Sequence, residues 1–385
     1  MSDSPTPSIP RSIVKRDTVE QQQRVACFIP DLADGGAQRA VVKLVGGMHA
    51  RGVAVDIVLV NNEGIHLRAV GAGVRVVVLA TGRVAKAVMP LARYMRRERP
   101  SVLISFLSHA NVVAVAARAL ARVRVRLALV EQNTVSAVRS DLRRDRWLPM
   151  LVRRAYPRAE AVVGVSSGVA HDLIARLGVP AHKVSVIHNP VVDNALLEAA
   201  SAPAGHAWLE DDSARVFVAS GRLTPQKDFT TLISAFRLLK SKVEAVRLII
   251  LGEGEERRRL EAMIDAMGLA GDVDLRGFVE NPYAYMSRAD AFVLSSRWEG
   301  LPTVLIEALA CGCPVVATDC PSGPREILQG GEYGALVPVG DAAALCDAMA
   351  RVLKTSPSKE ALREHAMRYS VDEAVRQYIE LLGLA

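Results

Sequence analysis

Short runs of β-branched and aliphatic residues alternate with longer stretches in which apolar positions recur at helical spacing. The first half contains seven strand-like runs, at residues 25–29, 55–60, 74–79, 102–106, 127–130, 161–165 and 184–187. Three stretches between them are predicted to be helical, at 37–51, 84–99 and 110–121, with Pro90 expected to bend or split the second. Such alternation is typical of α/β proteins, in which helices cover both faces of a parallel sheet.

The alternation stops at a polar stretch, residues 199–213, that contains Ala, Gly and Pro, and then restarts. Further strand-like runs lie at 216–219, 248–251, 273–275, 291–294 and 314–317. We therefore predict two facing, doubly wound, Rossmann-like domains, at residues 24–200 and 201–365. The carboxyl ends of both sheets would then surround one cleft, which is where such sheets bind ligands.

The two ends of the chain differ from these domains. Residues 1–23 are rich in Ser, Pro, Gln and charge, and we predict a disordered tail. Ser370 and Glu373 have the spacing of a capping box and predict a helix to about Leu382. We expect this C-terminal segment, 366–385, to pack back toward the N-terminal domain. No apolar run approaches the roughly 18 residues of a membrane span, so membrane contact is expected to be peripheral.

The composition and the distribution of charge limit the classes of function that the chain can have. The chain of 385 residues is 50% apolar, which excludes a disordered protein. Residues 1–200 carry 28 basic and 15 acidic side chains, whereas residues 201–385 carry 20 and 26. A basic half suits nucleic acid, an anionic membrane or a phosphorylated ligand, and a solvated Arg-rich face is the simplest alternative. Only 4% of residues are aromatic and no nucleic-acid motif is present, so we do not expect nucleic acid as a partner.

The five cysteines do not form a disulfide framework. Their odd number favours free thiols in a reducing compartment, so we expect a cytoplasmic protein, which could lie at the inner face of the plasma membrane. Cys311, Cys313 and Cys320 lack a second ligand pair at zinc-finger spacing, and packing thiols are the better interpretation. We expect neither a metal nor a cofactor.

The densest polar motif follows the strand-like run 291–294. Pro302 suits the first position of a helix, which places Glu307 in the second turn and Glu299 in the preceding loop. The helix N-terminus favours a phosphate, and the carboxylates can accept hydrogen bonds from hydroxyl groups. Upstream, Arg222 and Lys227 share one strand-to-helix loop, where two cations can neutralise a diphosphate. From spacing alone, both motifs could equally be solvated surface.

Taken together and in order, the motifs resemble those of family 4 glycosyltransferases, which are retaining enzymes of the GT-B fold. The resemblance covers nearly the whole chain from about residue 24. The matching motifs are Gly35-Gly36-Ala37-Gln38-Arg39, Gly221-Arg222 with Lys227, Gly252-Glu253-Gly254, Gly277-Phe278-Val279 and the pair Glu299 and Glu307. The continuation from Glu307 to Glu326 is similar to the branch that builds surface polysaccharides and lipid-linked oligosaccharides.

The resemblance implies roles for individual residues. Arg222 and Lys227 would bind the diphosphate of a nucleotide-sugar in place of a metal ion, and Glu299 would contact the sugar, so these three are the catalytic candidates. The implied donor-binding residues are Gly36, Gly221, Glu253, Phe278, Val279, Gly300, Leu301 and Glu307. Among these, Glu307 would hold the ribose, and the turn at 277–279 would meet the base.

The acceptor side departs from the family pattern. Many members carry a His after a strand of the N-terminal domain, whereas the corresponding loop here is Glu131-Gln132-Asn133-Thr134. The acceptor-side candidates are therefore His109, Glu131 and Asn133. The expected activity is retaining transfer of a hexose or N-acetylhexosamine from a UDP-sugar to a lipid-linked or glycan acceptor. The alternatives are a sugar-nucleotide epimerase of the same fold and a non-catalytic module that binds an anionic membrane.

Overall fold

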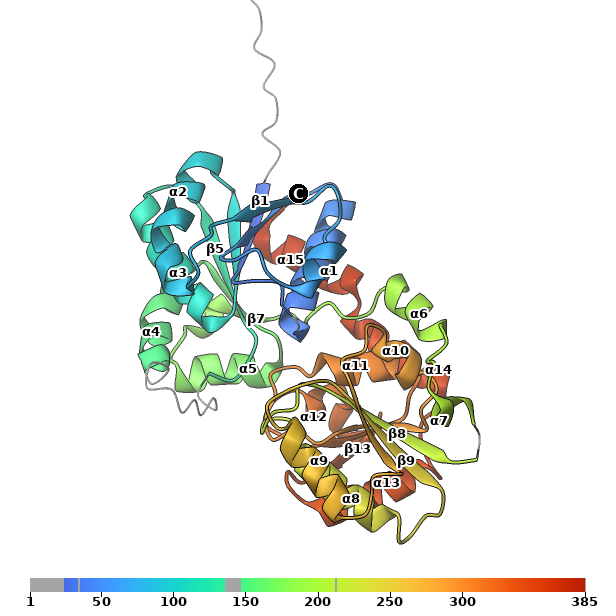
Figure 1. Ribbon diagram of the computed structural model, residues 1–385. Helices are drawn as coiled ribbons and strands as arrows, with labels where there is room; N and C mark the ends of the chain where they lie inside the picture. Colours follow the sequence, from blue (N-terminus) through green and yellow to red (C-terminus); the bar gives the residue numbers. More distant parts are fainter. Residues whose placement is uncertain (1–23, 34, 136–146, 212, 385) are drawn as a thin grey trace, which may run out of the picture.

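The computed structural model describes residues 24–33, 35–135, 147–211 and 213–384, which form two α/β domains (Figure 1). The tail predicted at 1–23 lies outside the described residues. Every neighbouring pair of strands in both sheets is parallel. Because helices cover both faces, the strands are buried on both sides, which explains why they read as continuous apolar runs.

The first sheet has seven strands in the order β3-β2-β1-β4-β5-β6-β7. They are β1 (Arg24–Ile29), β2 (Ala54–Leu59), β3 (Arg75–Val78), β4 (Val102–Phe106), β5 (Arg126–Glu131), β6 (Ala161–Gly164) and β7 (Val184–Val186). The main helices are α1 (Gly36–Ala50), α2 (Val88–Glu98), α3 (Ser108–Ala121), α4 (Leu148–Ala155) and α5 (Ser167–His171). Figure 1 shows α1 on one face of this sheet and α2, α3 and α4 on the other. The seven predicted strands agree with these bounds to within one residue.

The stretch predicted as one helix over 84–99 is divided. A 3₁₀ turn, Val84–Ala87, precedes α2, and Pro90 lies in the first turn of α2. The missing N–H of a proline costs no hydrogen bond there, because the first N–H groups of a helix have no partner within it. The division therefore falls before Pro90.

The second sheet has six strands in the order β10-β9-β8-β11-β12-β13. They are β8 (Arg215–Ser220), β9 (Val246–Leu251), β10 (Val273–Gly277), β11 (Ala291–Leu294), β12 (Val315–Thr318) and β13 (Ala335–Val337). Its helices are α8 (Phe229–Leu239), α9 (Arg257–Ala266), α10 (Pro282–Met286), α11 (Thr303–Ala310), α12 (Pro324–Ile327), α13 (Ala342–Val352) and α14 (Lys359–Ala366). The prediction missed β13, a three-residue strand at the edge of the sheet.

Two segments connect the domains. Between β7 and β8 lie α6 (Asn194–Ser201) and α7 (Ala207–Glu210). The chain ends in α15 (Val371–Leu382), whose N-cap Ser370 accepts a hydrogen bond from the backbone N–H of Glu373. This helix packs against α1, because a Cβ atom on Gly47 would lie 2.7 Å from Val371 Cγ1. Residues from the C-terminal end of the chain thus complete the first domain. Among the described residues, no helix combines the length and apolar character needed to span a bilayer.

Candidate active site

A cavity of about 350 Å³ lies in the cleft between the two domains. Its lining segments lie at or beyond the carboxyl ends of strands of both sheets. They are 35–39, Leu107 and 132–133 from the first, and 220–222, 251–253 and 278–279 from the second. The loop and first turn around α11, at 299–304, complete the wall together with Glu307. The cavity therefore forms where the carboxyl ends of the two parallel sheets face each other, as the sequence predicts.

Lys227 and Glu299 are joined at one end of the cavity. Lys227 Nζ donates a hydrogen bond to Glu299 Oε1 at 2.6 Å, and Ser296 Oγ donates to the same oxygen at 2.6 Å. Glu299 is 6% exposed, so its charge depends on these two partners for compensation. An ammonium group has three N–H donors, and Lys227 can therefore also bind an anion in the cavity.

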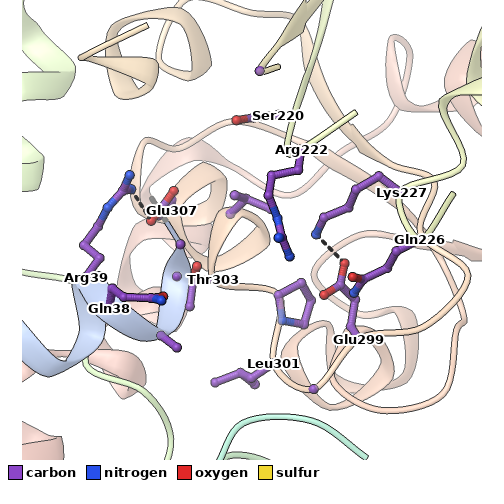
Figure 2. A pocket seen from close by; sticks show the side chains of 18 of the residues that line it. Gln38, Arg39, Ser220, Arg222, Gln226, Lys227, Glu299, Leu301, Thr303 and Glu307 are labelled. Atoms are coloured by element: carbon purple, nitrogen blue, oxygen red, sulfur yellow. Dashed lines mark hydrogen bonds and ion pairs between the residues drawn. The ribbon is translucent and has the colours of Figure 1, made fainter. Parts of the chain in front are cut away.

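Arg222 is the second cation that the sequence places here. Its exposed side chain extends into the cavity beside Lys227 (Figure 2). The loop that carries both residues is anchored to the loop before α11, because Gln226 Nε2 donates to the carbonyl oxygen of Trp298 at 2.9 Å. The structure thus brings Arg222, Lys227 and Glu299 together around one space, which has the donors to bind a diphosphate.

Glu307 lies toward the other end of the same wall. Its side chain is 2% exposed, and Oε1 accepts a hydrogen bond from Arg39 Nη1 at 3.0 Å (Figure 2). Its second oxygen, Oε2, is buried and has no hydrogen-bond partner among the described residues. The sequence predicts Pro302 as the first helical residue of α11, but in the structure Pro302 is the N-cap residue. Glu307 falls in the second turn, as predicted.

Two glycines allow the domains to approach closely across the cavity. A Cβ atom on Gly300 would lie 1.9 Å from the backbone oxygen of Gln132, and one on Gly36 would lie 2.8 Å from Thr303 Oγ1. Cβ atoms essentially never come within 3.0 Å of another heavy atom. The close approach between the second domain and the loop after β5 therefore requires glycine at position 300.

Two apolar residues, Phe278 and Val279, also line the cavity, and the Phe278 side chain is 51% exposed. Glu253 lines the cavity as well and is paired with Arg257, whose two hydrogen bonds of 2.7 Å lower the pKa of the carboxyl group. Glu253 therefore presents an ionised, already paired carboxylate beside an exposed aromatic ring. Gly221 and Leu301 also line the cavity.

The three acceptor-side candidates lie in different environments. Asn133 is exposed and lines the cavity. Glu131 is 1% exposed and is not part of the cavity lining. Its carboxyl group accepts hydrogen bonds from Ser108 Oγ at 2.9 Å and from the Tyr156 hydroxyl at 2.5 Å. Burial raises its pKa to about 7, although these hydrogen bonds oppose the shift. His109 is exposed and does not line the cavity. Of the three, only Asn133 is placed to meet a substrate.

Sequence reasoning missed a pair of amide side chains in the first domain. Gln132 and Asn189 both line the cavity and exchange two hydrogen bonds, at 3.2 and 2.8 Å. The position of Gln132 directly after β5 is a signal that could have identified it. Within the described ranges, no group of three or more His, Cys, Asp or Glu residues is arranged to hold a metal ion. The five cysteines are all buried and unpaired.

Comparison with known families agrees with this geometry. The family model of the group 1 glycosyl transferases matches residues 206–369, and that of Glycosyltransferase Family 4 matches residues 34–194. The two matches coincide with the two domains. The chain belongs to the family 4 glycosyltransferases and has the GT-B fold.

Similar members of this glycosyltransferase family align along most of the chain. An N-acetylgalactosamine-N,N'-diacetylbacillosaminyl-diphospho-undecaprenol 4-alpha-N-acetylgalactosaminyltransferase of Campylobacter jejuni is 28% identical over 89% of this chain and 94% of its own. The lipopolysaccharide core biosynthesis glycosyltransferase LpsE of Rhizobium meliloti is 27% identical over 91% and 96%. The Anabaena protein HepE, solved in complex with UDP-glucose, superposes with a TM-score of 0.78 over 94% of this chain and all of its own, at 20% identity. That likeness concerns the fold.

Proposed function

We propose that this glycosyltransferase moves a hexose or N-acetylhexosamine from a UDP-sugar to a lipid-linked or glycan acceptor, with retention of configuration and without a metal ion. The observation that carries the proposal is the convergence of Arg222, Lys227, Glu299 and Glu307 on one interdomain cavity. The solved complex of HepE with UDP-glucose supports the choice of donor. The name of the Campylobacter relative supports a lipid-linked acceptor, and that of the Rhizobium relative supports a role in building surface polysaccharides.

The charges along the cavity suggest how the donor would be oriented. The diphosphate would lie between Arg222, Lys227 and the N-terminus of α11, where positive groups stabilise the charge that develops on the departing nucleotide. Glu299, held by Lys227 and Ser296, would accept hydrogen bonds from the sugar. Phe278 and Val279 would contact the base. Glu307 would bind the ribose, which lies between the base and the diphosphate.

Retention would follow from attack on the same face that the nucleotide leaves. The acceptor hydroxyl would then pass its proton to the departing phosphate, so that no carboxylate nucleophile is needed. Asn133 and the Gln132–Asn189 pair face the cavity from the first domain, and they would orient the acceptor. Glu131 would act on this loop from beneath, because its carboxylate also accepts a hydrogen bond from the backbone N–H of Gln132 at 3.1 Å.

The acceptor chemistry also suggests where the enzyme works. We place it at the cytoplasmic face of an anionic membrane, since the Campylobacter relative acts on an undecaprenol diphosphate. The surface that would make this contact is the outer face of α4, where Trp147 and Leu151 are 62% and 41% exposed and Arg153 and Arg154 are also exposed. Aromatic and basic side chains side by side suit the interface of an anionic bilayer.

The assignment is tested by measuring UDP release from UDP-sugars in the presence of a polyprenyl diphosphate-linked acceptor. Replacing Lys227 with Ala should lower kcat/KM by about 10²- to 10³-fold, because one preorganised positive group is lost from the leaving phosphate. The control is Lys242→Ala, which removes an exposed lysine of the same domain that pairs with Asp347 far from the cavity lining. Wild-type activity in Lys227→Ala would refute the site. Release of UDP and free epimerised sugar without any acceptor would instead favour the epimerase.

A further inference from the structure

An ion pair joins the two domains beside the part of the cavity proposed for the ribose. Arg39 Nη1 lies 3.0 Å from Glu307 Oε1 and also donates to the Tyr283 hydroxyl at 3.0 Å. Arg39 on α1 of the first domain faces Glu307 on α11 of the second (Figure 2). Tyr283 is on α10, also of the second domain. The arginine therefore crosses the cleft to reach a residue of the donor site.

The carboxylate at the end of this pair is only half satisfied. Glu307 is buried at 2% exposure and lines the cavity, and its Oε2 has no hydrogen-bond partner among the described residues. A buried carboxylate requires an opposite charge and hydrogen bonds to both oxygens. Arg39 provides the charge and occupies one oxygen. The other oxygen can be satisfied by a hydroxyl group of a ligand in the cavity.

The surroundings of the pair fix its geometry. The Arg39 guanidinium carbon lies 6.0 Å from the centre of the Tyr283 ring, and burial raises the pKa of the Tyr283 hydroxyl, so the phenol remains neutral. Helix α1 begins directly at Gly36, which allows its first turn to approach Thr303 of α11. Arg39 can therefore reach Glu307 only where the domains are this close.

We propose that Arg39 is a positioning residue for the donor: it fixes the Glu307 carboxylate so that Oε2 faces a ribose hydroxyl. It does so only in the domain arrangement seen here, which we call closed. This inference rests on the proposed function, which assigns the ribose to Glu307. A nucleotide that uses Glu307 then binds the closed arrangement more tightly than an open one. Donor binding and domain closure are linked by that difference in affinity.

The test compares UDP with 2′-deoxy-UDP and 3′-deoxy-UDP by calorimetry. The unaltered enzyme should bind UDP about tenfold more tightly than the analogue that lacks the contacted hydroxyl, as expected for a hydrogen bond to a charged group. In Arg39→Met this preference should fall below about threefold, because the carboxylate is no longer held. In Arg39→Lys part of the preference should return. In an enzyme that already carries Glu307→Gln, Arg39→Met should change the preference no further.

The control is Arg51→Ala, which removes the arginine directly after α1, paired with Asp372 of α15 outside the cavity. It should leave the preference for UDP unchanged. If Arg39 merely supports the fold, Arg39→Met will weaken all three nucleotides equally and keep the preference at about tenfold, which would overturn the inference. Failure of the unaltered enzyme to bind UDP would instead overturn the proposed function. Thermal unfolding of each variant shows whether it is folded, so that unfolding is not mistaken for a lost preference. If Arg39→Met does not fold, the preference of Arg39→Lys is compared with that of the unaltered enzyme instead.

Discussion

Glu131 shows how a residue beside the active site can influence it without entering the cavity. Its carboxylate lies under the loop at 132–133, where Ser108, Tyr156 and the backbone of Gln132 donate hydrogen bonds to it. The strand β5 ends at Glu131, and this position lies on the buried side of the chain, whereas Asn133 is exposed to the cavity. Glu131 therefore supports the loop that presents Asn133.

The raised pKa of Glu131 predicts a dependence of stability on pH. The pKa of the folded protein is about 7, whereas the ordinary value is 4.5, so the folded state retains its proton to higher pH than the unfolded state. The free energy of unfolding should therefore fall as pH rises from about 4.5 to 7, by about 3 kcal/mol in total. Urea unfolding at pH 4 and pH 8 measures this change.

The comparison variant for this prediction is Glu131→Gln, which removes the titration and keeps the size of the side chain. Raising the pH from the lower to the higher value should therefore lower the unfolding free energy of the wild type by about 3 kcal/mol more than that of the variant. Glu244→Gln, at an exposed position, should behave like the wild type at both. An equal pH dependence in Glu131→Gln would show that another group is responsible.

At the scale of single elements, α4 departs from the usual distribution of apolar residues on a surface helix. Val152 and Ala155 are buried against the domain, but Met150 and Leu151 are 39% and 41% exposed on its outer side, and Trp147 precedes them by about one turn. Residues at positions i, i+3 and i+4 lie on one face of a helix. The apolar stripe therefore faces outward, together with Arg154 at i+7.

We predict that this face of α4 binds anionic membranes. The enzyme should co-float with vesicles of phosphatidylglycerol and phosphatidylcholine, less with phosphatidylcholine alone, and salt should release it because charge contributes to binding. Changing Trp147, Met150 and Leu151 to Ser should weaken vesicle binding by at least about tenfold, because buried apolar area is lost. Ile65→Ser, which changes an apolar residue of similar exposure on the short turn beside α1, is the control and should bind normally. Unchanged binding of the triple variant would exclude α4 as the contact.

The elements were more predictable from sequence than the contacts between them. Strands buried on both faces give unbroken apolar runs, which is why β1 and β4 were predictable, whereas β13 has three residues at the sheet edge and gives no such run. The cavity-lining residues of the second domain could be predicted to lie together because they sit in local motifs, such as the loop with Arg222 and Lys227. The partnership of Arg39 and Glu307 was not, because 268 positions separate them and only the packing of the two domains brings them together.

For the whole molecule, the relation between the domains determines whether the site is complete. Ser166 Oγ donates to the backbone oxygen of Gly300 at 2.8 Å, and Ser167 and His188 of the first domain bind Glu326 of the second at 2.8 and 2.7 Å. Although burial acts to raise the pKa of Glu326, hydrogen bonds from His188 and Ser167 lower it below the ordinary value. The Ser166 contact is made to the loop at 299–303, so the approach of the two domains aligns this loop, which we propose binds the donor, with the first domain.

The tight approach at Gly300 makes closure testable by adding one methyl group. In Gly300→Ala the new Cβ would lie 1.9 Å from the backbone oxygen of Gln132, which no side-chain rotation can relieve, so the domains must separate by about 1 Å. Such a displacement should lower kcat/KM by about 10²-fold, because the acceptor hydroxyl is no longer held within reacting distance of the sugar. Thermal unfolding should show a loss of stability as well, since Leu301 beside this contact belongs to a buried apolar cluster shared by the two domains.

The matched control for Gly300→Ala is Gly46→Ala, on the interior of α1. A Cβ atom there meets nothing within 4 Å, and alanine in place of a helical glycine should stabilise the fold by about 0.5–1 kcal/mol without changing the transfer rate. UDP-release kinetics and thermal unfolding of both variants distinguish an effect on closure from an effect on stability. If Gly300→Ala transfers sugar at the wild-type rate, the enzyme works without this approach of the domains, and the closed arrangement is then not the one in which chemistry occurs.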